Sequence, residues 1–258
     1  VLRLMQKEGF PVWFTPGVIH LPTVPVYRKA NKLDMGTADK VCCTALAIRS
    51  QAKFLDLDPT STSFILIEVG FAFTSVIAVE NGQIVDSLGG TSGGPGFITM
   101  GNMDAELAVR LGDFPGVVLF SGGAKDLSDR ADLTPEEMAE QPEKYADSWN
   151  TVLESVLKSV GAMTIAVEEP REILLSGRLT RIPKIAEALE AKLSRFGKVR
   201  QVTREAHTAK EAAEGSYIIG EGLMGGKYKG IVDAMKLRKA SGTMYDYIYL
   251  KGAEVEKP

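Results

Sequence analysis

A carboxylate, a glycine and a hydroxyl lie close together in residues 68–74, EVGFAFT, at a predicted turn between two strands. A glycine at the tip of a hairpin lets backbone N–H groups approach an anion closely. The hydroxyl of Thr74 can donate to the same phosphate as the backbone of Gly70, and the Glu68 carboxylate can hold a metal-bound water. The alternative is an ordinary β-hairpin with a glycine at its turn.

A second candidate lies where the predicted strand 173–175 ends in Ser176, Gly177 and Arg178, just before a helix. Small residues at such a turn let a ligand rest on the backbone, with the positive end of the helix beside it. We expect Arg178 to project into a cleft there and to face a nucleoside. The alternative is an ordinary connection between a strand and a helix.

Basic and acidic side chains are mixed in residues 28–40, RKANKLDMGTADK. Arg28 or Lys29 can hold a carboxylate, and Asp34 or Asp39 can bind Mg²⁺ or a substrate hydroxyl. The alternative is a basic loop followed by a capped helix.

Strands and helices in a recognisable order position these groups. Residues 37–53 carry apolar side chains at helical spacing, and residues 63–88 are typical of a β-meander with an Asn-Gly turn. A glycine-rich loop follows at 89–96. The later expected elements are helices at 104–111, 142–163, 182–196, 209–225 and 231–239, and strands at 117–120, 173–175 and 199–202. Three strands followed by alternating helices and strands predict an α/β layered fold.

Three other segments have weaker patterns. The prolines in residues 11–30 favour loops and edge strands. Residues 125–143 are polar, which predicts an exposed insertion, and residues 245–250 resemble a short strand at the tail of the chain.

Composition narrows the class of protein. The 258 residues suffice for two domains of ordinary size, and the net charge of −3, without a long basic run, argues against a nucleic-acid surface. The sequence contains no apolar stretch of the roughly 20 residues that span a bilayer. The adjacent Cys42 and Cys43 exclude a disulfide framework and favour a cytoplasmic location. Two histidines in all provide no zinc-ligand spacing.

The first two motifs, in this order, resemble the second phosphate loop and the adenosine loop of the superfamily of actin, heat-shock chaperones, sugar kinases and acetate kinases. The phosphate loop of that superfamily has an acidic residue, a glycine two positions later and a threonine four beyond, here Glu68, Gly70 and Thr74. Its adenosine loop reads Ser-Gly-Gly or Gly-Gly, here Ser176 and Gly177. The resemblance implies an actin-like ATPase (ribonuclease H-like) fold, with a complete second domain and a truncated first domain.

Residues 28–40, together with the loop at 89–96, resemble an uncharacterised, archaeal-type family of predicted butyrate kinases. The resemblance implies phosphoryl transfer from ATP, with Mg²⁺, to a small carboxylate, a reaction that depends on positioning and charge neutralisation. It assigns Asp34, Asp39 and Arg28 to the chemistry. Glu68, through water, and Asp39 are implied for Mg²⁺. The residues implied for ATP are Glu68, Gly70, Thr74, Gly89, Gly90, Ser176, Gly177 and Arg178.

The resemblance also divides the chain. Residues 1–52 correspond to the end of the first domain and an interdomain helix, and residues 53–258 to the second domain, with the insertion near 125–143. The superfamily's first phosphate loop, Asp-x-Gly-x-Thr, has no counterpart in the sequence. We therefore expect this chain to be a poor kinase, and to self-associate, as a homodimer for example, through apolar surface around Val12, Phe14 and Val18, or to be part of a longer polypeptide.

Three departures bear on the site. Glu68 stands where aspartate is usual, Arg178 replaces a second glycine, and no arginine closely follows the glycine-rich loop. Two other functions stay open. A sugar or polyol kinase needs a general base, for which Asp34 or Asp39 can serve. A nucleotide-binding scaffold or degenerate kinase is favoured by the missing first loop.

Overall fold

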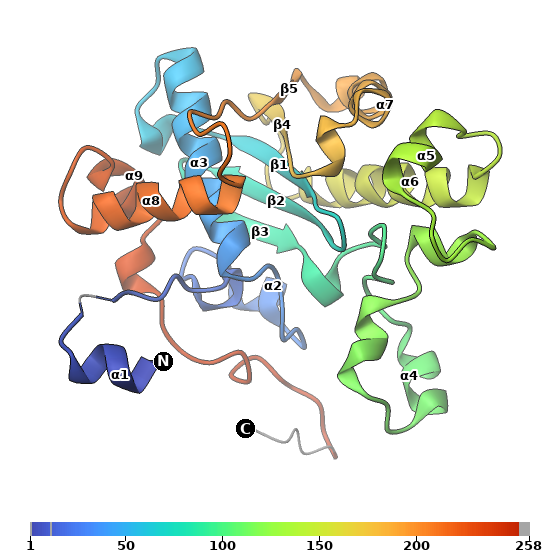
Figure 1. The fold of residues 1–258 in the computed structure, drawn as a ribbon. Helices are drawn as coiled ribbons and strands as arrows, with labels where there is room; N and C mark the ends of the chain where they lie inside the picture. Colours follow the sequence, from blue (N-terminus) through green and yellow to red (C-terminus); the bar gives the residue numbers. More distant parts are fainter. Residues whose placement is uncertain (1, 11, 253–258) are drawn as a thin grey trace.

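A five-stranded mixed sheet forms the centre of the chain in the computed structural model, which describes residues 2–10 and 12–252 (Figure 1). The strands are β1 (Phe64–Val69), β2 (Thr74–Glu80), β3 (Gln83–Leu88), β4 (Glu172–Ser176) and β5 (Val199–Gln201). The first three pair antiparallel, whereas β4 pairs parallel to β1 and β5 parallel to β4. The order β3-β2-β1-β4-β5 places β1 in the middle of the sheet. This position suits its nearly continuous apolar sequence, because a central strand is buried on both faces.

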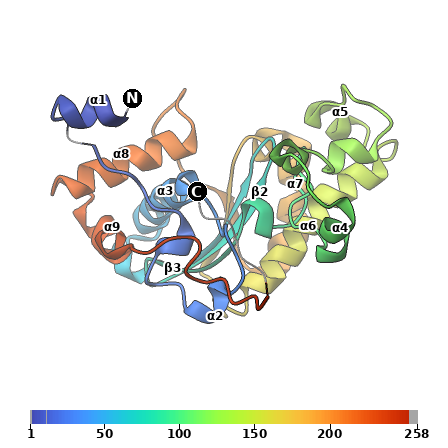
Figure 2. The ribbon, with the colours of Figure 1, turned by 90° about the horizontal axis from the view of Figure 1, so that it is seen from below.

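Helices cover both faces of the sheet (Figure 2). The helices α3 (Ala38–Leu55), α8 (Glu211–Leu223) and α9 (Lys229–Ala234) share one apolar core with Leu66 of β1. On the other face, Ile65 and Ile67 belong to the core formed with α5 (Pro135–Glu140), α6 (Ala146–Met163) and α7 (Pro183–Leu193). Alternate residues of a strand point to opposite faces, so β1 contributes to both cores.

The other helices are short. The α-helices are α1 (Leu2–Lys7), α2 (Val26–Lys29) and α4 (Ala105–Leu111). The 3₁₀ turns are Val18–His20, Pro59–Ser61, Gly90–Ser92, Gly116–Phe120, Ala124–Leu127, Leu179–Arg181, Ser194–Phe196 and Leu237–Lys239. None of the helices in the described ranges has both the length and the apolar character that crossing a membrane requires.

The predicted α/β class is confirmed, but several local predictions are wrong. Residues 117–120 lie in a 3₁₀ turn, with Val117 and Phe120 exposed, because a short apolar run does not determine its own conformation. The described residues between 12 and 30 form a 3₁₀ turn and α2 in place of edge strands, and residues 245–250 form no strand. Of the residues expected at an exposed apolar surface, Val12 and Phe14 are exposed but Val18 is fully buried in the core that α3 and α8 share.

The polar segment 125–143 also differs from the prediction of an exposed insertion. Met138 and Ala139 of α5 are fully buried, and both belong to the core that α6 and α7 share. The segment therefore packs through a few apolar residues although its sequence is mostly polar. The division of the chain at residue 52 stays a prediction; α3 runs across that position to Leu55.

Candidate functional site

A row of polar side chains crosses three strands at one end of the sheet. Glu68 of β1 pairs in register with Ser75 of β2 on one side and with Ser176 of β4 on the other. Residues paired in register point to the same face of a sheet, here the face that holds Leu66 and is covered by α3 and α8. All three side chains are buried. We call Ser75, Glu68 and Ser176 the polar row.

Hydroxyl groups in and beside this row lack hydrogen-bond partners. Ser75, Ser176 and the neighbouring Thr74 are each at most 5% exposed, and their side-chain oxygens make no hydrogen bond with any described residue. Leaving one buried hydroxyl unpaired costs about 1–3 kcal/mol, so three such groups together call for an explanation. Ser75 and Ser176 lie on the face of the polar row, whereas Thr74, one residue before Ser75, points to the opposite face of the sheet. A ligand rich in oxygen atoms, such as a phosphate, would provide partners for the two serines.

Lys40, in the first turn of α3, places a buried ammonium group beside the polar row. Its Nζ lies 2.6 Å from Oε2 of Glu68 and 2.8 Å from Oδ2 of Asp39. Burial alone would lower the pKa of Lys40, but the two carboxylates outweigh burial and raise this pKa above its ordinary value, so Lys40 carries a positive charge.

Lys40 received no role from sequence reasoning, although it lies within residues 28–40. A lysine in the first turn of a helix is unfavourable because its charge opposes the helix dipole. This unfavourable position is the sequence feature that could have indicated a role for Lys40. Its partner Glu68 lies on a strand, and only the fold brings the two together.

Asp34 contacts the glycine-rich loop. Its Oδ1 accepts a hydrogen bond of 2.7 Å from the Gly36 N–H, and its pKa is raised by burial. Gly90 has a φ of +59°, and a Cβ there would lie 1.7 Å from Oδ2 of Asp34, so this contact requires glycine. A Cβ at Gly89 would lie 2.7 Å from Oγ of Ser75. The fold therefore brings Asp34, Gly89 and Gly90 to the end of the polar row.

Asp39 is held by its neighbours. Its Oδ1 accepts a hydrogen bond of 2.5 Å from the Thr37 hydroxyl, and Oδ2 accepts one from Lys40. Burial would raise the pKa of Asp39, but Lys40 and Thr37 outweigh burial and lower this pKa. Asp39 is therefore ionised and already carries two hydrogen bonds.

The hairpin between β1 and β2 uses its glycine internally. The Gly70 N–H donates to the Phe73 carbonyl oxygen at 3.0 Å, and a Cβ at Gly70 would lie 2.9 Å from that same oxygen. The turn therefore needs glycine whether or not a phosphate binds there. The predicted role of Gly70 in phosphate binding stays a prediction.

The turn after β4 lies against this hairpin. Gly177 has a φ of +99°, and a Cβ there would lie 2.5 Å from the Val69 carbonyl oxygen, so close strand packing requires glycine. The Arg178 guanidinium lies 4.6 Å from the centre of the Phe71 ring, and its Nη2 lies 3.5 Å from Oε1 of Glu136 on α5. Arg178 therefore connects the turn after β4, the hairpin tip and α5.

Arg28 lies apart from the polar row. Its Nη1 donates to the Val85 carbonyl oxygen at 2.9 Å, and its Nε lies 3.5 Å from Oδ2 of Asp86. Both partners belong to β3. The neighbouring Lys29 is buried and donates to the Leu21 carbonyl oxygen at 2.7 Å. These contacts account for both basic residues within the fold itself.

The predicted metal ligands are engaged by Lys40. Glu68 and Asp39, the two residues proposed for Mg²⁺, share the Lys40 ammonium group. Across residues 2–10 and 12–252, no group of three or more His, Cys, Asp or Glu side chains is arranged to hold a metal ion. The carboxylates in this arrangement do not fit a metal ion while Lys40 is bound to them.

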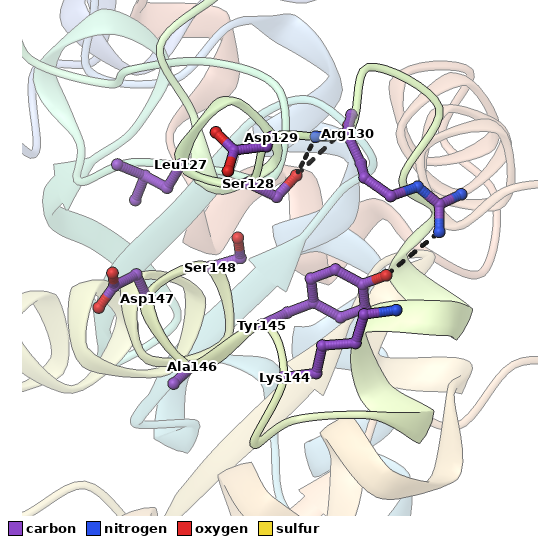
Figure 3. Close-up of a pocket in the computed structure, with 9 residues that line it drawn as sticks. All are labelled: Leu127, Ser128, Asp129, Arg130, Lys144, Tyr145, Ala146, Asp147 and Ser148. Atoms are coloured by element: carbon purple, nitrogen blue, oxygen red, sulfur yellow. Dashed lines mark hydrogen bonds between the residues drawn. The ribbon is translucent and has the colours of Figure 1, made fainter.

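A separate pocket of about 350 Å³ opens between residues 127–130 and the start of α6 (Figure 3). The Arg130 guanidinium donates to the Tyr145 hydroxyl at one side of it. None of its lining residues belongs to the predicted site, so this pocket is distinct from the polar row.

A family described as "Protein of unknown function (DUF1464)" matches residues 1–250. The chain belongs to this family. None of the curated proteins matches the chain.

Solved structures with a similar fold include acetate kinases from two organisms. The enzyme from Porphyromonas gingivalis is 12% identical, with a TM-score of 0.54 over 70% of this chain and 54% of its own. The enzyme from Entamoeba histolytica is 13% identical, with a TM-score of 0.50 over 60% of this chain and 44% of its own. This DUF1464 chain thus spans about half the length of these kinases. At such identities the likeness concerns the fold, and it supports the predicted actin-like ATPase architecture.

Arg178 provides a test of the adenosine-loop prediction in this DUF1464 protein. If its guanidinium stacks on a nucleoside as it does on Phe71, Arg178→Gly should weaken ATP binding about 5-fold, the size of one partly exposed cation–π contact. Titration calorimetry with ATP measures this. Glu136→Gln is the matched control, because it removes the ion pair and leaves the contact with Phe71. Equal ATP affinity in wild type and Arg178→Gly would contradict the assignment.

Proposed function

We propose that this chain forms the nucleotide-binding half of an ATP-dependent phosphotransferase that acts on a small carboxylate such as acetate, propionate or butyrate. The observation that carries the proposal is the pair of unpartnered hydroxyls, on Ser75 and Ser176, that flank Glu68 beside the Lys40 ammonium group. Fixed donors and a fixed positive charge are what phosphoryl transfer requires, since the reaction is catalysed mainly by positioning and electrostatics. The acetate kinase fold supports the same class of reaction.

The fold suggests how ATP would lie. The phosphates would meet the hydroxyls of Ser75 and Ser176 at the end of the sheet, close to Lys40. The nucleoside would lie beside Gly177, where the Arg178 side chain is more than half exposed. Mg²⁺ bound to the phosphates of ATP would supply further positive charge. We assign no step to a metal held by Glu68 and Asp39, because both carboxylates already hold Lys40.

The decisive test is trapping of an acyl phosphate. The full-length protein, given ATP, hydroxylamine and acetate, propionate or butyrate in turn, should form the corresponding hydroxamate. A carboxylate acceptor is already ionised and needs no general base, so Asp34→Asn should keep turnover within about 10-fold of wild type. Asp39→Asn is less informative because it also weakens the hold on Lys40.

The main rival is a sugar or polyol kinase. Asp34 is a better candidate than Asp39 for the general base of such a kinase. A hydroxyl acceptor needs a base, and burial raises the pKa of Asp34 whereas Lys40 lowers that of Asp39. Loss of about 10²- to 10⁴-fold in Asp34→Asn with a polyol acceptor would favour this rival. ATP binding without turnover on any acceptor would favour a scaffold.

A further inference from the structure

We propose that the Lys40 ammonium group occupies the cation position between the Asp39 and Glu68 carboxylates, so that Lys40 and a divalent metal ion cannot bind these carboxylates at the same time. The proposal goes beyond the proposed function and does not depend on it. It concerns a residue that no sequence motif assigns, and it can be tested without ATP or an acceptor.

The Lys40 side chain is held in place along its length. The backbone of Gly36 packs closely against the aliphatic part of the side chain. A Cβ placed at Gly36 would lie 3.3 Å from Cβ and 3.4 Å from Cγ of Lys40. The side chain is 11% exposed, and two of its three N–H donors face carboxylates at 2.6 and 2.8 Å. An ammonium group fixed in this way stands where a cation bridging Asp39 and Glu68 would have to stand.

The surrounding charges favour a cation at this point. Besides Asp39 and Glu68, the carboxylates of Asp34 and Glu211 act on the pair. Glu211 is compensated, because Arg181 donates to both of its oxygens, at 2.6 and 2.7 Å. Asp34 has no such partner among the ion pairs of the described residues. Negative charge therefore exceeds the single charge of Lys40, so removing Lys40 should make the pair a ligand for a metal ion.

Oxygen ligands of this kind suit Mg²⁺ and Mn²⁺. A neighbouring charge typically changes a carboxylate's affinity for a cation by about 10- to 1000-fold, by analogy with its effect on proton affinity. We therefore expect Lys40→Gln, which keeps a hydrogen-bonding side chain but no charge, to bind Mn²⁺ about 100-fold more tightly than wild type.

The experiment measures free Mn²⁺ by electron paramagnetic resonance in the full-length protein, without nucleotide. Lys40→Gln should deplete free Mn²⁺ at concentrations where wild type does not, and the double variant Lys40→Gln/Glu68→Gln should lose this gain. Lys53→Gln is the matched control, since Lys53 is an exposed lysine on the same helix. Equal binding by wild type and Lys40→Gln, or a gain that survives in the double variant, would overturn the proposal.

A second measurement needs no variant and keeps the proposal testable if Lys40→Gln does not fold. The ¹⁵Nζ resonance of Lys40 in the wild-type protein should keep its line width in millimolar Mn²⁺, because the ion cannot approach the occupied carboxylates. Selective broadening of this resonance would show that metal and lysine share the site, contrary to the proposal. Both results are independent of kinase activity, so the proposed function can fail while this inference stands.

Discussion

Replacing Gly215 by alanine should lower the melting temperature by roughly 6–12 °C. Overpacking should cost about 3 kcal/mol, and each kcal/mol lowers the melting temperature of a chain of this size by about 2–4 °C. Gly215 lies in α8 where this helix crosses α3, and a Cβ there would lie 1.9 Å from the carbonyl oxygen of Cys42. Backbone atoms cannot rotate away as a flexible side chain can. The two helices would have to separate and lose apolar contacts in the core they share.

Gly220→Ala is the matched control for this effect. Gly220 lies in the same helix, and a Cβ there would meet no atom within 4 Å. Alanine is favoured over glycine in helices by about 1 kcal/mol, so this variant should keep or raise the melting temperature. Calorimetry of both variants separates the cost of the crossing from any general effect of alanine. A melting temperature in Gly215→Ala equal to that of Gly220→Ala would mean that the crossing can relax.

The elements that the sequence predicts well depend on local chemistry. Asn81 and Gly82 both have positive φ, at 51° and 70°, as the turn between β2 and β3 requires, and Glu80 pairs with Gln83 across it. The apolar run of β1 likewise indicates a strand buried on both faces. Such signals lie within a few residues of the structure they determine.

The sequence predicts the candidate site less well, because the site depends on contacts between distant segments. Glu68 can be recognised in the sequence as part of a hairpin motif. Its contact with Lys40 cannot, because it forms only when α3 packs on β1. The glycines are ambiguous for a different reason. Gly70 and Gly177 match a phosphate and an adenosine motif, yet each is already needed by a close backbone contact of the fold. Tertiary packing and ligand binding can require the same residue type, and a single sequence does not separate them.

Thr74→Val should separate function from stability at this site. Thr74 is 5% exposed, and its hydroxyl has no hydrogen-bond partner among the described residues. Valine has the same shape without the unpaired polar group, so the melting temperature should stay the same or rise. If the hydroxyl donates to the transferred phosphate, turnover should fall by about 10²- to 10³-fold, the typical effect of losing one preorganised donor.

The same substitution at Thr62 provides the contrast. Thr62 is also buried, but its hydroxyl donates to the Pro59 carbonyl oxygen at 2.8 Å, and it precedes β1 at the end of that strand opposite Glu68. Thr62→Val should cost about 1 kcal/mol and roughly 2–4 °C in melting temperature, with turnover unchanged. We therefore expect opposite results for the two variants: Thr74→Val should lose hydroxamate formation and keep its melting temperature, and Thr62→Val should do the reverse. If Thr74→Val lost stability and kept its turnover, its hydroxyl would serve the fold, and the predicted role of Thr74 in phosphate binding would be wrong.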